Sequence, residues 1–146
     1  MRTADPDSTA ADALLSLRFP ADPCRLREVR EQVQSLCEGI GCGAKPIAEL
    51  VLAVNEACMN IIQHAYKGDP TGLIVLEMRR DGAHLEVVIK DFAAPVQLGE
   101  IAPRALHELR PGGLGTHFIR ATVDECTYGH LTDRAGNFVK MRKRIR

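Results

Sequence analysis

The spacing of apolar residues changes several times along the chain, and each change predicts a boundary between elements. Residues 14–19 alternate loosely and predict a first strand. Asp22 and Pro23 then begin a helix, with a carboxylate at the N-cap and proline at the first helical position. This helix ends at Gly39-Ile40-Gly41, since glycine is typical just past a helix. Its core-facing residues are Leu26, Val29, Val33 and Leu36.

A second and longer helix is predicted from Lys45-Pro46 to about Gly68-Asp69-Pro70. Its apolar residues recur at i, i+3, i+4 and i+7, the pattern of a helix that packs one face on a core. The residues expected on that face are Ile47, Leu50, Val51, Val54, Ile61 and Ile62.

Four further runs have strand character and form two predicted hairpins. They are 73–80 with 85–91, and 125–131 with 138–145. Asp81-Gly82 is a strong signal for the first turn, and residues 133–136 form the second. Because hairpins dominate, we expect a mostly antiparallel sheet with helices on one face, an α+β fold.

Residues 92–111, between the hairpins, show little sustained periodicity and predict a loop with one helical turn near 104–109. A glycine cluster at 111–115 then opens a third predicted helix, 116–123. We expect one domain over residues 14–146, after a disordered N-terminal segment at 1–13.

Charge and composition exclude several classes of function. The 146 residues carry a formal net charge of zero, so there is no argument for direct nucleic-acid binding. The basic residues of 140–146 are interpreted as the solvated face of a last strand, whose lysines and arginines protect the edge of the sheet. No apolar run is long enough for a membrane span, and the polar, acidic start does not resemble a signal peptide, so a cytoplasmic location is expected.

The five cysteines are an odd number at scattered spacing, with no C-x-x-C pair and no zinc-ligand spacing to a histidine. We interpret them as reduced thiols, mostly buried. Cys42, in the sequence G-C-G, is the one expected to be exposed. A catalytic role for it would need a base that the sequence does not indicate.

Glu56, Asn60 and His64 are spaced four residues apart, which places them on one stripe of the second helix. A carboxylate and a carboxamide in register suit a magnesium–nucleotide site, since magnesium prefers oxygen ligands. The alternative is an ordinary polar face directed to solvent.

Two other features suit a nucleotide. Glycines that precede a helix let backbone N–H groups approach phosphates. Asp91 ends an apolar strand, where a buried carboxylate can accept a hydrogen bond from an amine such as that of adenine. The alternatives are a tight loop that needs positive φ, and an aspartate that caps a turn. The sequence lacks a P-loop.

Three segments together resemble the GHKL ATP-binding fold, a two-layer α/β sandwich also called the Bergerat fold. The run E-A-C-M-N-I-I-Q-H-A-Y resembles its N-box, and Asp91 resembles the aspartate of its first glycine box. The run P-G-G-L-G-T-H-F-I-R-A-T-V-D-E-C-T-Y resembles the second glycine box of the anti-sigma-factor serine/threonine kinases. The resemblance covers residues 14–144 and implies an ATP-dependent protein kinase.

The resemblance also implies roles for individual residues. Asn60 would be the ligand of Mg²⁺, and Glu56 would be the general base or orienting carboxylate for the attacking hydroxyl. Asp91 would recognise the adenine amine by accepting its hydrogen bond. The other residues expected to line the ATP site are His64, Ala65, Ala93, Arg110, Gly112, Gly113, Leu114, Gly115 and Thr116.

One position departs from the family pattern. Ala93 occupies the place of the first glycine in D-x-G-x-G, in the sequence D-F-A-A-P. If that position requires positive φ, a Cβ atom would cost about 1 kcal/mol or more and weaken ATP binding. The alternative function is therefore a catalytically silent module that binds partners.

The partners that the resemblance implies are a STAS-domain antagonist protein as substrate and a sigma factor or similar regulator held by partner switching, with the kinase as a homodimer. A switch kinase that acts on a STAS scaffold protein fits the same sequence. A detached histidine-kinase domain ranks last, because it needs a phosphorylatable histidine and His64 lies in the predicted pocket.

Overall fold

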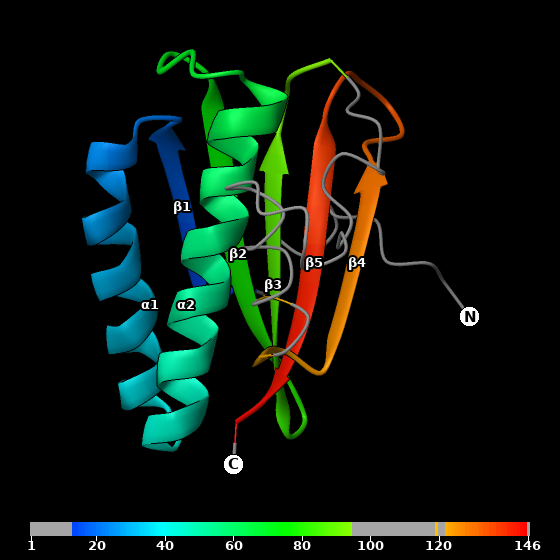
Figure 1. Ribbon diagram of the computed structural model, residues 1–146. Helices are drawn as coiled ribbons and strands as arrows, with labels where there is room; N and C mark the ends of the chain where they lie inside the picture. Colours follow the sequence, from blue (N-terminus) through cyan, green and yellow to red (C-terminus); the bar gives the residue numbers. More distant parts are fainter. Residues whose placement is uncertain (1–12, 95–118, 120–121, 146) are drawn as a thin grey trace, which may run out of the picture.

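A computed structural model describes residues 13–94, 119 and 122–145. It has two layers, a five-stranded antiparallel sheet and, across one of its faces, the helices α1 and α2 (Figure 1). The order of strands in the sheet is β1-β2-β3-β5-β4. The α+β sandwich predicted from the sequence is confirmed. The strands are β1 (Leu15–Pro20), β2 (Leu73–Asp81), β3 (His84–Asp91), β4 (Glu125–His130) and β5 (Asn137–Arg144).

The first helical segment begins with a 3₁₀ turn, η2 (Pro23–Arg25), and continues as α1 (Leu26–Gly39). The predicted N-cap is confirmed, because the Cys24 backbone N–H donates to Asp22 Oδ1 over 2.9 Å. The expectation of a regular helix from Pro23 was wrong by one turn. Gly41, with φ +82°, ends the segment as predicted.

The second helix, α2 (Ala44–Asn60), does not continue as a regular helix. Residues Ile61–Ala65 form one turn of π-helix, η3, in which the Tyr66 N–H donates to Ile61 O over 3.0 Å. Positive φ angles at Lys67 (52°) and Gly68 (86°) then end the segment. A strict four-residue stripe was therefore the wrong description beyond Asn60, because a π turn contains more residues than an α turn.

The core lies between the helices and the inner face of the sheet. Alternate residues of the central strands are buried there, and the helices contribute residues such as Val33, Leu50 and Val54. Two residues expected in the core, Ile47 and Val51, are half-buried instead and line a groove between α1 and α2. The sheet residues that are completely buried on the inner face are Ile74, Leu76, Met78, Leu85, Val87, Ile89 and Met141.

The outer face of the central strands carries buried charges that the sequence analysis did not anticipate. Lys90 Nζ lies 3.1 Å from Glu77 Oε1, and both side chains are 5% exposed. Glu86, 2% exposed, contacts three cations. Because neighbouring residues in a strand point to opposite faces, these charges belong to the side away from α1 and α2. The three cations are Arg79, Lys140 and Arg142.

Within the described part of the chain, none of the helices is long and apolar enough to cross a membrane. The predicted loop and third helix fall mostly outside the described residues. Of that helix, Ile119 and Thr122 are helical, and Ile119 is completely buried.

Candidate functional site

Asp91, at the end of β3, is the most deeply buried carboxylate of the predicted site, with 1% of its surface exposed. Its Oδ1 accepts hydrogen bonds from Asn137 Nδ2 (2.9 Å) and from the Ala93 backbone N–H (3.1 Å). Burial raises the pKa of Asp91, while the hydrogen bond from Asn137 acts in the opposite direction. A carboxylate has about four lone-pair sites, so these donors leave capacity for a donor on a ligand.

Asn137 is placed by the ladder between β3 and β5, in which it lies directly opposite Asp91. Its side chain is buried, and Nδ2 also donates to Ala94 O over 3.3 Å. Gly136, with φ +150°, precedes it, and a Cβ atom there would collide with Asp91 O and with Leu131. The sequence analysis treated Gly136 as a turn residue and missed Asn137, because nothing local in the sequence pairs Asn137 with Asp91.

Tyr66, at the end of the helical segment, makes hydrogen bonds to the backbone at the start of β2 and just after β3. Its hydroxyl donates to Leu73 O (2.6 Å) and accepts from the Phe92 N–H (2.8 Å). The ring passes so close to Gly72 that a Cβ atom there would lie 2.5 Å from it. Burial raises the pKa of Tyr66, so the hydroxyl keeps its proton for Leu73. This residue closes the N-box-like run, yet the sequence analysis gave it no role.

Asn60, Ala65 and Asp91 line one cavity of about 30 Å³, so the structure brings together three of the predicted site residues from distant parts of the chain. Asn60 is 4% exposed. The remaining lining residues are Ala57, Ile61, Tyr128, Asn137, Phe138 and Val139. This volume is the size of a single water site, so the cavity by itself is too small to hold a nucleotide.

Glu56 and His64 are half-buried and are not among the residues that line this cavity. His64 lies in the π turn, which displaces it from the α-helical register of Glu56 and Asn60. The predicted phosphate-binding residues lie outside the described residues. They are Arg110, Gly112, Gly113, Leu114, Gly115 and Thr116.

Ala93 is accommodated without backbone strain. Lys67 is the one non-glycine residue with positive φ in the described part of the chain, so Ala93 does not adopt the left-handed conformation that would favour glycine. Its N–H instead contributes to the hydrogen bonding of Asp91. The steric reason for expecting weak ATP binding therefore does not apply to the backbone at this position.

Asn60 is the predicted ligand of Mg²⁺, and it is one of the residues that line the Asp91 cavity. Among the residues that can be described, no three His, Cys, Asp or Glu side chains converge on a possible metal position. Mg²⁺ commonly takes one or two protein oxygens and completes its octahedron with phosphate and water. If Mg²⁺ is bound here, the Asn60 carboxamide would be such a ligand.

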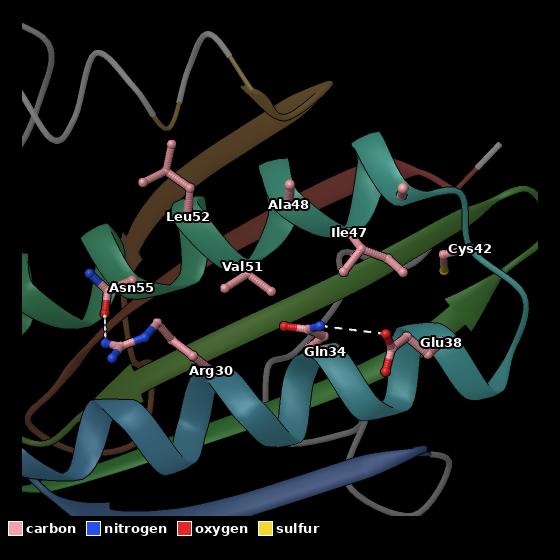
Figure 2. Close-up of a pocket in the computed structure, with 10 residues that line it drawn as sticks. Arg30, Gln34, Glu38, Cys42, Ile47, Ala48, Val51, Leu52 and Asn55 are labelled. Carbon is pink, nitrogen blue, oxygen red and sulfur yellow. Dashed lines mark hydrogen bonds between the residues drawn. The ribbon is translucent and has the colours of Figure 1, made fainter.

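A larger cavity lies elsewhere on the molecule, away from the predicted ATP-site residues. This groove of about 720 Å³ runs between α1 and α2 (Figure 2). Arg30 donates to Asn55 Oδ1 across it over 2.8 Å. None of the predicted site residues lines it.

Residues 19–143 match the family model of the histidine kinase-like ATPase domain. Serine-protein kinase RsbW of Bacillus licheniformis is 30% identical over 124 residues, 80% of this chain and 77% of the relative. RsbW of Bacillus subtilis (strain 168) is 30% identical over 119 residues, 76% and 74% of the two chains.

Two solved structures share the fold. One, from Mycobacterium tuberculosis, contains RsbU and RsbW domains and superposes with a TM-score of 0.65 at 20% identity, over 90% of this chain and 31% of that one. The other, the SiaB–SiaC complex of Pseudomonas aeruginosa, gives a TM-score of 0.66 at 15% identity, over 94% of both chains.

The chain belongs to the histidine kinase-like ATPase family. Within that family it belongs with the RsbW-type serine-protein kinases, as the 30% identity over 80% of this chain and 77% of the relative shows. The resemblance to GHKL anti-sigma-factor kinases is thus confirmed, and with it the class of enzyme, an ATP-dependent protein serine/threonine kinase.

Proposed function

We propose that the protein binds Mg–ATP over the Asp91 cavity and phosphorylates a serine or threonine of a STAS-domain antagonist protein. The observation that carries this proposal is the meeting of Asp91 and Asn60 in one cavity, a buried acceptor and a carboxamide contributed by different elements. In this arrangement Asp91 accepts a hydrogen bond from the adenine amine, and Asn60 contributes an oxygen to Mg²⁺.

The chemistry of phosphoryl transfer demands little covalent help from the protein. ATP with Mg²⁺ supplies the phosphoryl group and the neutralising charge, and the protein holds the reacting groups in line. Glu56, one helical turn before Asn60, is assigned to orient the attacking hydroxyl and accept its proton. The Glu56 side chain is half-buried, so a substrate hydroxyl can approach it from outside the Asp91 cavity. His64 and the glycine-rich residues 112–115 are assigned to the phosphate side of the site.

The relatives support the proposal that this chain acts on a protein partner. RsbW proteins are named as serine-protein kinases, and the structural neighbour SiaB was solved in complex with SiaC. We propose partner switching for this chain, in which the kinase holds a sigma factor or comparable regulator until unphosphorylated antagonist competes for it. We also propose a cytoplasmic homodimer. A STAS scaffold protein in place of the antagonist is the second possible substrate.

Transfer of labelled phosphate from ATP to a purified STAS-domain antagonist tests the proposal. The wild type should label the antagonist on serine or threonine, whereas Glu56→Gln should lower the rate at least tenfold and leave the amount of bound antagonist unchanged. Glu31→Gln, an exposed glutamate on α1, is the matched control and should behave as wild type. If antagonist binds but is not labelled by the wild type, the protein is instead a silent partner-binding module.

A further inference from the structure

Cys37 and Cys42 meet at the end of α1 because of the way in which that helix stops. The Cys42 N–H donates to Cys37 O (3.0 Å) and the Gly41 N–H donates to Glu38 O (3.2 Å), with Gly41 in the left-handed conformation. These are the two hydrogen bonds of a Schellman motif. In this motif the side chain after the left-handed residue contacts a side chain of the last helical turn. Here both of those side chains are thiols.

The two cysteines are held close together by the backbone and differ in accessibility. Burial together with the proximity of Cys42 raises the pKa of Cys37 to about 12. Cys37 is completely buried, whereas Cys42 is partly exposed and lines the groove between α1 and α2 (Figure 2). An oxidant that enters the groove therefore reaches Cys42 before the buried Cys37.

We propose that Cys37 and Cys42 form a reversible redox modification site, which hydrogen peroxide converts to an intramolecular disulfide. The Cys42 sulfur attacks one peroxide oxygen, the O–O bond breaks, and one water leaves, so that Cys42 becomes a sulfenic acid. The Cys37 sulfur then attacks the Cys42 sulfur, the S–S bond forms, and the sulfenic oxygen leaves with the thiol proton as a second water. Two thiols lose two electrons in total, and one peroxide gains them.

The backbone geometry favours the second step over competing reactions of the sulfenic acid. A disulfide needs its two Cα atoms close together, and the hydrogen bond from Cys42 N–H to Cys37 O keeps these two backbones in contact. Disulfides in intracellular proteins are typically transient and redox-sensing, and a dithiol reductant restores the thiols. The proposal concerns the end of α1 and does not depend on the kinase assignment.

Proteolytic cleavage after glutamate tests the proposal, because Glu38 lies between the two cysteines and cleavage there places them on separate peptides. The full-length protein is treated with one equivalent of hydrogen peroxide, the remaining thiols are alkylated, and the chain is cleaved after glutamate. Peptides 32–38 and 39–49 each contain one of the two cysteines. We expect them to be found joined, lighter than their sum by two hydrogen atoms, and to separate after reduction with dithiothreitol.

Two variants distinguish this pair from adventitious oxidation. Cys42→Ser should abolish the joined peptides, while Cys24→Ser, which removes the exposed cysteine before α1, should leave their yield unchanged. Circular dichroism checks that both variants are folded. If peptides 32–38 and 39–49 are recovered separately, with Cys37 alkylated and Cys42 either alkylated or oxidised beyond sulfenic acid, the proposal is wrong. It is equally wrong if Cys37 is found joined to any other cysteine.

Discussion

Asn137 Nδ2 lies 2.9 Å from Asp91 Oδ1, between two residues that are direct partners in the β3–β5 ladder. This contact orients the one carboxylate of the site that is almost fully removed from solvent. A buried carboxylate is costly unless hydrogen bonds or a nearby charge compensate for its lost hydration, and both Asn137 and the charge interaction with His130 lower the pKa of Asp91. Asp91 therefore lowers the stability of the fold, and it provides a hydrogen-bond acceptor that is already in position for a ligand.

Asp91→Asn should separate these two effects. Because burial raises the folded-state pKa of Asp91, the folded wild type binds more protons than the unfolded chain above the ordinary value of 3.8. Wild-type stability should therefore fall as pH rises from 3.8 through the raised pKa, whereas the variant lacks this titration. Urea unfolding across pH should show the stability of the variant, relative to wild type, rising through that window and then becoming constant.

The binding behaviour of the same variant supplies the second half of the prediction. Asp91→Asn should lose measurable ATP affinity, because the acceptor of the adenine amine is replaced by an amide that can turn its NH₂ towards the ligand. Asn55→Asp, a change of the opposite sense in the α1–α2 groove, should leave ATP binding as in wild type. A stability difference that does not vary with pH would contradict the assigned pKa direction.

Tyr66→Phe should weaken both the fold and the site. The variant loses the hydrogen bond to Leu73 O and leaves the Phe92 N–H without its acceptor, at a cost of about 1–3 kcal/mol in unfolding free energy. Since Phe92 follows Asp91, ATP affinity should also fall. Thermal unfolding and calorimetric titration measure the two effects. Unchanged values for both would mean that the Tyr66 hydroxyl does not position the end of β3.

The buried pair on the outer face of the sheet should show strong coupling between its members. Lys90→Met leaves the Glu77 carboxylate buried without its ammonium partner, which should cost about 3–5 kcal/mol in unfolding free energy. Adding Glu77→Met should recover most of that loss, because an apolar pair avoids the desolvation of both charges. Arg27→Met, from an exposed pair on α1, is the control and should change stability little. A double variant as unstable as Lys90→Met would contradict this account.

The sequence predicted local features well and failed where distant residues meet. Helix caps and hairpin turns depend on neighbouring residues, so Asp22, Gly41 and Asp81-Gly82 were interpreted correctly. The contacts of Asn137 with Asp91 cross 46 residues and leave no periodic signal in the sequence. The π turn at Ile61–Ala65 was missed for a related reason, because a spacing of four residues is taken to be α-helical unless other evidence intervenes.

The candidate site was predicted in part for the same reasons. Asn60, Ala65 and Asp91 were found from motif order, and the structure brings them to one cavity. Tyr66 was adjacent to the motif but had no predicted role, since its two backbone partners come from β2 and from the segment after β3. The Schellman contact of Cys37 and Cys42 was readable in principle from the G-I-G-C ending, but the cysteines were judged by their spacing for metals and disulfide frameworks instead.

Calorimetric titration of the protein with ATP, with and without magnesium, tests the central claim most directly. The wild type should bind ATP in a magnesium-dependent manner. Asn60→Ala should lose most of the magnesium effect, while Asn55→Ala, the same change on the groove side of α2, should keep it. Binding that is independent of magnesium, or equal in the wild type and Asn60→Ala, would contradict the assignment of Asn60, and no binding by the folded wild type would contradict the nucleotide site as a whole.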